Sequence, residues 1–473
     1  MLFHNAGKRL KLLCVMTAGQ ARLTGPMPFT KIGATSRPNK NKSYGRVHIQ
    51  RGRVMSRKFV RATVLGAAAA LFALGAQAAG TVKVAYIDPM SGGMANVGEQ
   101  GLAEFQFYAD WLNAHGGVLG KKLEIVPFDN KVSPQESLNQ LKRVEDEGIR
   151  YITQGNSSAV ALALSDAVTK FNERNPGKEI LYLNYAAVDP ALTNEKCSFW
   201  HFRFDANADM KMEALTAVMA KDKSIHKVYL IDQDYSFGHA VADAAVRMLK
   251  RKRPDIQIVG NEFHPIARVK DFSPYVAKIK ASGAQAVITG NWGNDMSLLV
   301  KAGREAGLNV DWYTFYAGGL GTPTAMGDAA AGHVKIVAEY HSNVVPNRAA
   351  AWDAAYRKQA PKGNPDFYYL RGKVMFDMLV AAMKKANSDD PVKVAYALEG
   401  LKMEGDMGEL EMRKDDHQLI QPLFVFTLQK SAAHGGPKQA KIDMEGSGLA
   451  PVTDARIEPY VTATATSCQM KRP

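Results

Sequence analysis

The sequence predicts an α/β protein in which parallel sheets are flanked by helices and divided between two lobes. Short apolar runs typical of strands alternate with amphipathic helical patterns along most of the chain. Strands separated by helical crossovers form parallel sheets. The chain has 473 residues, and a predicted leader of 78 leaves 395. That length is too great for one ordinary hydrophobic core, so we expect two lobes.

The leader ends in a predicted signal peptide, residues 55–78. It begins with three basic residues, continues with an apolar run over 62–74 and closes on the small-residue site Ala76-Gln77-Ala78. The run is shorter than the ~20 residues that span a bilayer as a helix. We therefore expect an exported protein cleaved near Ala78/Ala79 rather than an anchored one.

The preceding residues, 1–54, are interpreted as a non-native extension from a start site placed too early, with Met55 as the initiator. A functional basic tail is the alternative. The 78-residue leader holds fourteen Lys and Arg and no acid, whereas the whole chain holds 60 basic and 46 acidic residues. The remaining 395 residues are thus neutral, with 46 of each sign. The charge of +14 belongs to the leader, which excludes a nucleic-acid binder.

After cleavage two cysteines would remain, Cys197 and Cys468. In an oxidising compartment an even number of cysteines predicts a disulfide. Two unpaired thiols are the alternative. A bond between them would fasten the C-terminal tail to the middle of the chain.

In the first half, helix signals accompany the strand pattern. Ser133 is a predicted N-cap with Pro134 at the first helical position, and a glycine pair ends the preceding helix. The expected strands are 81–87, 121–129, 150–155 and 179–185, and the expected helices are 101–117, 133–148 and one that ends near Arg174.

The same alternation resumes beyond residue 207, again with short apolar runs between helical patterns. The expected strands are 226–232, 255–263, 285–290 and 311–317, and the expected helices are 207–222, 239–251, 272–283 and 296–308. Two further helical patterns, over 352–360 and 367–386, precede a hairpin-like stretch at 407–430.

Signatures of catalysis are missing from the sequence. It contains no GxSxG, HExxH, CxxC or GxxxxGK[ST] motif, and its histidines show no metal-ligand spacing. The glycines of SGGMANVG (91–98) have the wrong spacing for a dinucleotide-binding loop, so this segment is interpreted as a ligand-facing loop. We expect no catalytic residues, no metal and no cofactor.

Small polar residues instead cluster after the carboxyl ends of the expected strands. Ligands bind at this edge of open α/β sheets, where loop amides and helix N-termini can hold anions. The clusters are Ser91-Gly92-Gly93, Gly155-Asn156-Ser157-Ser158, Ala186-Ala187, Asp234-Tyr235-Ser236, Asn291-Trp292-Gly293-Asn294 and Gly318-Gly319.

With these loops in place, the chain resembles the periplasmic solute-binding proteins of branched-chain-amino-acid-type ABC transporters. The similarity covers nearly all of residues 80–430 and is carried by KVAYIDPMSGG, LNAHGGVLGKKLEIV, TQGNSSAVALAL, LNYAAVDPALTNEKCSFWHFR, LIDQDYSFGHAV, VITGNWGNDMSLLVKAGREAGL and GDMGELEMRKDDHQ. It implies the type I fold, with two Rossmann-like lobes joined by a hinge that the chain crosses three times.

The resemblance also implies where each lobe begins and ends. The first lobe would comprise 80–203 plus 342–415 and the second 205–338 plus 419–450, followed by a C-terminal tail over 451–473. The three crossings would lie near Arg203–Asp205, Glu339–Ser342 and Asp415–Leu419.

The ligand positions of the family carry over individually. The implied contacts are the carboxylate-binding loop Asn156, Ser157 and Ser158, the loop Ala186, Ala187 and Val188, the covering aromatic Tyr235, the loop Asn291 and Trp292, Gly318, and Val97 in place of an aromatic residue. Amino-acid binders usually carry an acid near Gly318 that pairs with the ammonium of the ligand. Unless Asp234 or Asp295 substitutes, we expect a ligand without an amine, such as an aromatic or other organic acid.

The resemblance implies a monomeric periplasmic receptor that delivers a small solute to the permease and ATPase of an ABC importer. It implies no enzymatic activity and no nucleic-acid partner. A ligand-sensing protein for a receptor or regulator is one alternative. An exported hydrolase is the other, and the missing nucleophile and base motifs argue against it.

Overall fold

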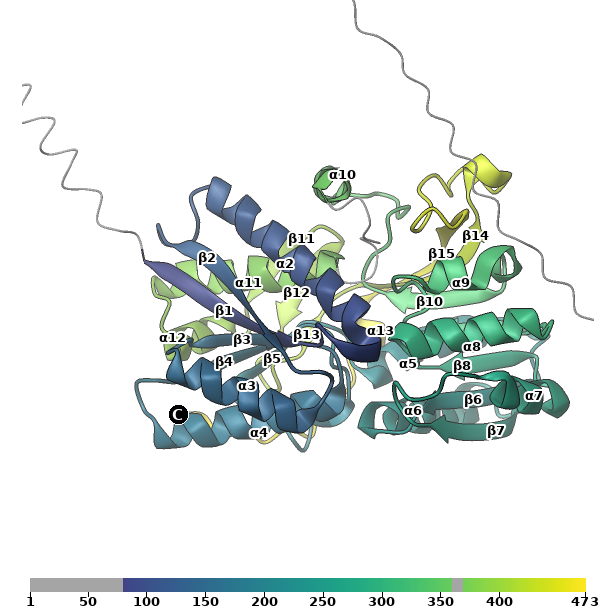
Figure 1. Cartoon of the computed structure of the whole chain (residues 1–473), viewed down its shortest axis with the longest axis horizontal. Coiled ribbons are helices and arrows are strands. Elements are labelled where there is room, and N and C mark those ends of the chain that lie inside the picture. The colour runs from purple at the N-terminus through teal and green to yellow at the C-terminus, as the bar shows by residue number, and fades with distance from the viewer. Residues whose placement is uncertain (1–79, 360–368) are drawn as a thin grey trace, which may run out of the picture. The chain divides into compact units, whose positions relative to one another are not determined.

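The computed structural model describes residues 80–359 and 369–473. The predicted extension 1–54 and signal peptide 55–78 lie outside the described residues. The described residues contain two large sheets and a small one, with helices packed on the faces of the large sheets (Figure 1). The predicted α/β class with parallel sheets is confirmed.

The first sheet has five parallel strands in the order β2-β1-β3-β4-β5. They are β1 (Thr81–Asp88), β2 (Lys122–Asp129), β3 (Tyr151–Gln154), β4 (Leu181–Asn184) and β5 (His201–Arg203). Every residue of β3, β4 and β5 is buried, as expected for parallel strands covered on both faces. We call the part of the chain built on this sheet the first lobe.

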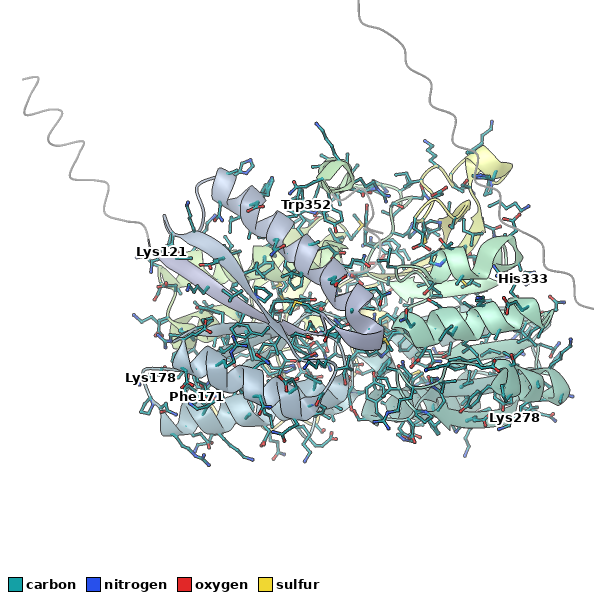
Figure 2. The ribbon with its side chains drawn as sticks, viewed as in Figure 1. Lys121, Phe171, Lys178, Lys278, His333 and Trp352 are labelled. Carbon is teal, nitrogen blue, oxygen red and sulfur yellow. A yellow bond between two sulfur atoms is a disulfide. The ribbon has the colours of Figure 1, made fainter. Side chains whose placement is uncertain are left out.

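Helices cover both faces of this sheet, and Ser133 caps α3 as predicted by accepting a hydrogen bond from Glu136 N at 3.2 Å. They are α2 (Ala95–Ala114), α3 (Pro134–Asp146), α4 (Ser158–Arg174), α10 (Ala350–Gln359), α11 (Tyr369–Ala386) and α12 (Pro391–Leu398), with the short turns η1 (Gly92–Met94) and η2 (Pro190–Thr193). On α10, Trp352 packs its ring 5.0 Å from the ring of Phe107 on α2 (Figure 2).

Helix α2 begins six residues before the expected start at 101, because η1 leads directly into it. Gly98 and Gly101 lie inside this helix for reasons of packing. A Cβ on Gly98 would lie 1.7 Å from the Pro89 carbonyl oxygen, and one on Gly101 would lie 2.6 Å from the Tyr86 hydroxyl. Gly98, which the sequence analysis places in a loop, and Gly101, the first residue of the expected helix, thus let α2 lie close to β1 and the segment that follows it.

The second sheet has seven strands in the order β15-β14-β10-β9-β8-β6-β7, of which β6 to β10 are parallel and β14 and β15 are antiparallel. They are β6 (Lys227–Gln233), β7 (Gln257–His264), β8 (Ala286–Thr289), β9 (Asp311–Thr314), β10 (Val334–Ala338), β14 (Leu423–Lys430) and β15 (Leu449–Ile457). We call the part built on this sheet the second lobe.

The helices of the second lobe follow its strands as the sequence predicts. They are α5 (Ala208–Met219), α6 (Ser236–Lys252), α7 (Ser273–Ser282), α8 (Gly293–Glu305), α9 (Thr322–Met326) and α13 (Pro459–Thr462), with the short turns η3 (Gly327–Ala330) and η4 (Ala432–His434).

The chain passes between the two sheets after β5, after β10 and again before β14. The hairpin-like stretch 407–430 differs from expectation. Its first part joins β11 (Lys402–Gly405), β12 (Gly408–Met412) and β13 (Leu419–Ile420) in a small antiparallel sheet, whereas β14 joins the second sheet. Strand β15 also extends past residue 450, into the segment expected as the C-terminal tail. The expected lobe boundaries remain a prediction.

Two features tie the crossings to the lobes. Cys197 and Cys468 form a disulfide, which resolves the choice left open by the sequence. In addition, four buried charges surround the first two crossings. Arg371 pairs with Asp205 at 2.7 Å and with Glu339 at 2.7 Å, and Lys211 pairs with Asp205 at 2.9 Å.

Candidate functional site

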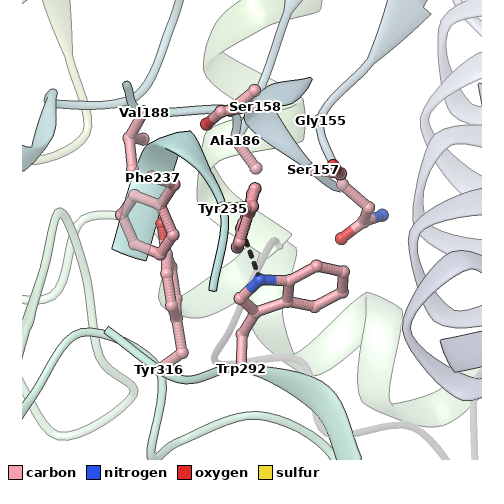
Figure 3. Close-up of a pocket in the computed structure, with 11 residues that line it drawn as sticks. Gly155, Ser157, Ser158, Ala186, Val188, Tyr235, Phe237, Trp292 and Tyr316 are labelled. Atoms are coloured by element: carbon pink, nitrogen blue, oxygen red, sulfur yellow. Dashed lines mark hydrogen bonds between the residues drawn. The ribbon is translucent and has the colours of Figure 1, made fainter. Parts of the chain in front are cut away.

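A small cavity lies between the carboxyl ends of the strands of the two lobes (Figure 3). The first lobe contributes loop residues that follow β3 and β4, and the second lobe contributes aromatic residues. The lining residues are Gly155, Asn156, Ser157, Ser158, Ala186, Ala187, Val188, Tyr235, Phe237, Trp292 and Tyr316. The enclosed space measures about 20 Å³, which is room for one water molecule.

The loop after β3 is fixed by hydrogen bonds from its backbone to a buried carboxyl group. Asp88 at the end of β1 is fully buried and accepts hydrogen bonds from Gly155 N at 3.1 Å and Asn156 N at 3.0 Å. The Tyr185 hydroxyl donates to the same carboxylate at 2.7 Å. Burial raises the pKa of Asp88 to about 7, although the hydrogen bonds oppose the shift. Asp88 therefore fixes the loop and uses two of its amides.

Ser157, at the N-terminus of α4, has an unusual backbone conformation. Its backbone φ of +83° lies in a region that residues other than glycine rarely adopt. Such strain costs about 1–3 kcal/mol and is concentrated at functional sites. The Ser157 side chain does not cap α4. Ser157 and Ser158, at the start of this 17-residue helix, line the cavity, and the helix dipole favours a negative charge at this end.

The loop after β4 presents apolar groups instead. Asn184 Oδ1 accepts hydrogen bonds from Ala186 N at 3.1 Å and from Ala187 N at 2.8 Å, so these two amides are used within the loop. Asp189 N donates to Ser158 Oγ at 3.2 Å, which joins this loop to the preceding one. The methyl groups of the loop thus form an apolar wall beside the polar Ser157 region.

The second lobe closes the cavity with four aromatic rings. Tyr235 precedes α6 and Trp292 precedes α8, and the indole Nε1–H of Trp292 donates to the Tyr235 hydroxyl at 2.8 Å (Figure 3). Phe237 packs 5.9 Å from Tyr235 and 6.0 Å from Tyr316 between ring centroids. These rings offer stacking surface together with indole and hydroxyl groups.

Among the described residues, those that line the cavity are all uncharged. The buried Lys211 has its Nζ 5.2 Å from the centre of the Tyr316 ring, behind the lining, and it is paired with Asp205. Asp295 is buried and accepts hydrogen bonds from Gln233 Nε2 and Ala267 N, both at 2.8 Å. Asp234 bonds His239 at 2.9 Å on the surface. Neither acid lines the cavity.

Most of the residues singled out from the sequence meet at this cavity. Eight of them line it: Asn156, Ser157, Ser158, Ala186, Ala187, Val188, Tyr235 and Trp292. Whether they bind a ligand remains a prediction.

Three expected contacts lie elsewhere. The Asn291 side chain is buried and bonds His264 Nε2 at 2.8 Å. Gly318 packs against Met444, whose Cε would lie 3.0 Å from a Cβ at this position. Val97 packs toward Gly293, where a Cβ would lie 3.4 Å from Val97 Cγ2.

Gly155, which the sequence places in a predicted cluster but not among the implied contacts, lines the cavity, and so do Phe237 and Tyr316, which were not expected there. Phe237 lies two residues after Tyr235, and Tyr316 lies two residues before Gly318. The only sequence feature that could have identified Phe237 and Tyr316 is that each is an aromatic residue two positions from an expected contact. The sequence alone does not show which side chain of each loop turns inward.

The two lobes also touch beside the cavity. Asn294 Nδ2, in the first turn of α8, donates a hydrogen bond to the Gly93 carbonyl oxygen of η1. Gly293 lies against Met94 and Val97 of the first lobe. We call this contact between 92–97 and 292–294 the rim contact.

The described residues contain no group of three or more His, Cys, Asp or Glu side chains arranged to hold a metal ion. Within residues 80–359 and 369–473, no helix combines the length and apolar character needed to cross a bilayer.

The sequence matches the model of the periplasmic binding protein family over residues 81–434. A relative from Brucella abortus (strain 2308), Leu/Ile/Val-binding protein homolog 4, is 33% identical and aligns with 88% of this chain and 99% of its own length.

Two solved structures share the fold. The leucine-, isoleucine-, valine-, threonine- and alanine-binding protein of Brucella ovis, in a closed conformation, is 30% identical, covers 84% of this chain and 100% of its own, and has a TM-score of 0.73. A solute-binding protein of an ABC transporter from Rhodopseudomonas palustris BisB5, in complex with 3,4-dihydroxybenzoic acid, is 21% identical, covers 80% and 98%, and has a TM-score of 0.69.

Proposed function

The chain belongs to the periplasmic binding protein family, and from this premise we propose that it is the solute receptor of an ABC importer for a small aromatic or other organic acid. One structure with the same fold is the solute-binding protein of an ABC transporter, which supports a permease and an ATPase as the proposed partners. We further propose that the mature chain begins near Ala79 and acts as a monomer in the periplasm.

One observation carries the choice of solute, namely the uncharged lining of the cavity. An α-amino acid brings an ammonium group, and burying that group without a counter-charge costs several kcal/mol. Asp234 and Asp295 are the two acids that could have supplied the counter-charge, but both make their hydrogen bonds and ion pairs outside the cavity lining. A carboxylate has a better match, because the N-terminus of α4 lies at the cavity.

In this proposal the solute carboxylate binds the Ser157 hydroxyl and the free amides at the start of α4. Its body packs between the methyl groups of the loop after β4 and the four aromatic rings. The cavity holds only about one water molecule. Entry of a benzoate-sized solute therefore requires the lobes to open.

A second candidate solute is a branched-chain amino acid. The Brucella relatives that share 30% and 33% of their residues with this chain are named for binding such amino acids. For this chain to do the same, backbone carbonyl groups would have to receive the ammonium group in place of an acidic side chain.

A thermal-shift screen of residues 79–473 tests the proposal. The panel holds leucine, isoleucine, benzoate, 4-hydroxybenzoate, benzamide and butyrate. A solute at 100 times its Kd stabilises the folded protein by about 2.7 kcal/mol, so we expect a rise of a few degrees in Tm with one or more of the acids. A rise with leucine or isoleucine alone would overturn the choice of solute.

Two variants test whether the solute-induced rise in Tm arises from binding at the cavity. Ser157→Ala removes the hydroxyl that faces the proposed carboxylate and should reduce the shift. Ser282→Ala is the matched control, because Ser282 bonds Ile279 O at the end of α7 and is not a lining residue. Equal shifts in both variants would remove Ser157 from the site.

A further inference from the structure

We propose that the disulfide-bonded C-terminal segment, residues 463–473, positions the solute loop Ala186–Asp189 and restrains two of the three crossings between the lobes. We call this segment the tail. Three links connect it to the cavity, through the turn η2, the side chain of Arg203 and the loop itself, and a fourth joins the crossings. The inference rests on the proposed function only in naming the loop a solute loop, because the links themselves are independent of any ligand.

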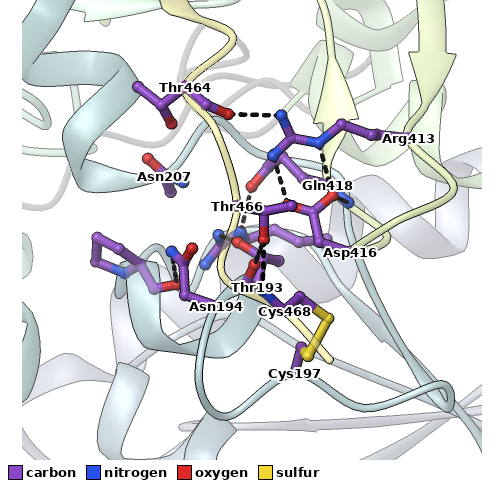
Figure 4. A network of polar contacts seen from close by, with 12 residues as sticks. Thr193, Asn194, Cys197, Asn207, Arg413, Asp416, Gln418, Thr464, Thr466 and Cys468 are labelled. Atoms are coloured by element: carbon purple, nitrogen blue, oxygen red, sulfur yellow. Dashed lines mark hydrogen bonds and ion pairs between the residues drawn. A yellow bond between two sulfur atoms is a disulfide. The ribbon is translucent and has the colours of Figure 1, made fainter. Parts of the chain in front are cut away.

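The first link joins the tail to η2 and the residues that follow it. Thr466 Oγ1 donates to the Thr193 carbonyl oxygen at 2.7 Å (Figure 4), and Ser467 N donates to Asn194 Oδ1 at 3.0 Å. The disulfide between Cys468 and Cys197 fixes the same stretch covalently. The tail thus holds residues 193–197 through side-chain, backbone and covalent contacts.

The second link runs from this turn to Arg203, whose side chain is completely buried. Its guanidinium donates to the Asp189 carbonyl oxygen at 2.6 Å, to the Thr193 hydroxyl and to Gln418 Oε1 at 2.7 Å. A buried guanidinium is costly unless its donors are satisfied. The turn η2, which the tail contacts, supplies the Thr193 hydroxyl as one acceptor, and Asp189, which supplies another, directly precedes this turn. We therefore regard Arg203 as a positioning residue.

The third link runs from Arg203 to the solute loop. Asp189 directly follows Val188, which lines the cavity. While its carbonyl oxygen accepts from Arg203, its amide donates to Ser158 Oγ at 3.2 Å, and its carboxylate caps η2 by accepting from Ala191 N at 2.9 Å. A shift of the turn would therefore move both loops that form the first-lobe wall.

The fourth link joins the crossings. Arg203 N donates to the His417 carbonyl oxygen at 2.9 Å, and Gln418 Nε2 donates to the Asp205 carbonyl oxygen at 2.8 Å. Gln421 Nε2 continues the pairing by donating to Phe204 O at 3.0 Å. The first and third crossings are therefore bonded side by side at the residue that the tail supports.

The end of the tail reinforces the same region. Arg472 Nε donates to Glu399 Oε1 at 2.8 Å, and that oxygen also bonds His417 Nε2 at 2.9 Å. Arg413, which pairs with Asp416, donates to the Thr464 carbonyl oxygen at 2.6 Å (Figure 4). The tail therefore contacts both the turn near the solute loop and the segment that leads into the third crossing.

The test compares Thr466→Val with Thr464→Val in the mature chain. Thr466→Val removes the hydroxyl that bonds Thr193 O and keeps the disulfide. Thr464→Val makes the same chemical change two residues away, where the bond to Arg413 uses only the backbone oxygen. One hydrogen bond contributes a modest amount to stability. We expect amide exchange over 186–194 to become about threefold to tenfold faster in Thr466→Val, with no change over β7.

The double variant Cys197→Ser/Cys468→Ser should show a larger effect over the same residues and a solute Kd at least fivefold weaker. Unchanged exchange over 186–194 in both Thr466→Val and the double variant, with a lower Tm in the latter, would show that the tail only adds stability and would overturn the inference. If the double variant fails to fold, Thr466→Val decides alone. If Thr466→Val shows faster exchange over 186–194 but the protein binds none of the acids, the proposed class of solute is wrong and the role of the tail is still supported.

Discussion

Substitution of Gly293 by alanine tests whether the rim contact is part of the solute-bound conformation. Gly293 begins α8 with φ at +60°, and a Cβ there would lie 2.4 Å from Met94 Sδ in the opposite lobe. The left-handed conformation costs alanine about 1–2 kcal/mol whether the lobes are apart or together. The collision with Met94 exists only when the lobes touch.

The collision sets the expected size of the effect. Inserting a methyl group into a packed contact costs about 1–3 kcal/mol, and Met94 is almost completely buried. If the solute binds between touching lobes, that cost appears in the binding equilibrium. The solute Kd of Gly293→Ala should therefore rise by about 5- to 150-fold.

Gly307→Ala is the matched control. Gly307 has the same φ of +60°, but a Cβ there would meet nothing within 4 Å. Thermal denaturation should give both variants a lower Tm than the unsubstituted chain, and calorimetric titration should give a weaker Kd only in Gly293→Ala. Adding Met94→Ala to Gly293→Ala should restore part of the affinity. Equal Kd values for Gly293→Ala and Gly307→Ala would refute the role of the rim contact.

Three further substitutions have defined outcomes. Tyr235→Ala removes a ring from the cavity wall and should weaken solute binding about 10- to 100-fold in the same titration, because burying such a ring is worth roughly 1.5–3 kcal/mol. Asp88→Asn should alter the pH dependence of stability: burial raises the pKa of Asp88 from 3.8 to about 7, so its contribution is fully present below the unfolded pKa and is lost as pH rises to about 7. The Tm of the unsubstituted chain minus that of Asp88→Asn should therefore fall between pH 4 and pH 8. Arg371→Met removes the ion-pair partner of buried Glu339 and leaves buried Asp205 with Lys211 alone, and it should lower the free energy of unfolding by about 3–5 kcal/mol in urea titrations.

Each of these outcomes can fail in a specific way. Unchanged affinity in Tyr235→Ala would place the solute away from the aromatic wall. A Tm difference for Asp88→Asn that stays constant with pH would mean that the Asp88 carboxyl does not titrate in that window. A loss below 1 kcal/mol in Arg371→Met would mean that the two carboxylates find other partners.

The strand pattern could be predicted because buried parallel strands are apolar over their whole length. Helices α6 and α8 begin three residues before their expected starts at 239 and 296, since their first turns carry loop-like residues such as Ser236 and Gly293. Strand β14 lies within 419–450, which the resemblance assigns to the second lobe. Its partner β15 runs mostly past residue 450, and the sequence carries no local signal for a pairing between segments so far apart.

The cavity was predictable to the level of loops but not of side chains. Gly155 to Ser158 line it because a loop at a strand end has few other places to face. After β9, however, Tyr316 turns toward the cavity whereas Gly318 packs on Met444. The buried ion pairs of Arg371 with Asp205 and Glu339 unite three segments distant in sequence, and the sequence carries no local signal for such pairing.

The nature of the solute is the central claim, and isothermal titration of residues 79–473 with benzoate, 4-hydroxybenzoate and L-leucine under one set of conditions tests it most directly. The uncharged cavity lining predicts that at least one acid binds and that leucine binds about 100-fold more weakly or not at all, since an unpaired buried ammonium costs several kcal/mol. Leucine binding more tightly than every acid tested would contradict the account.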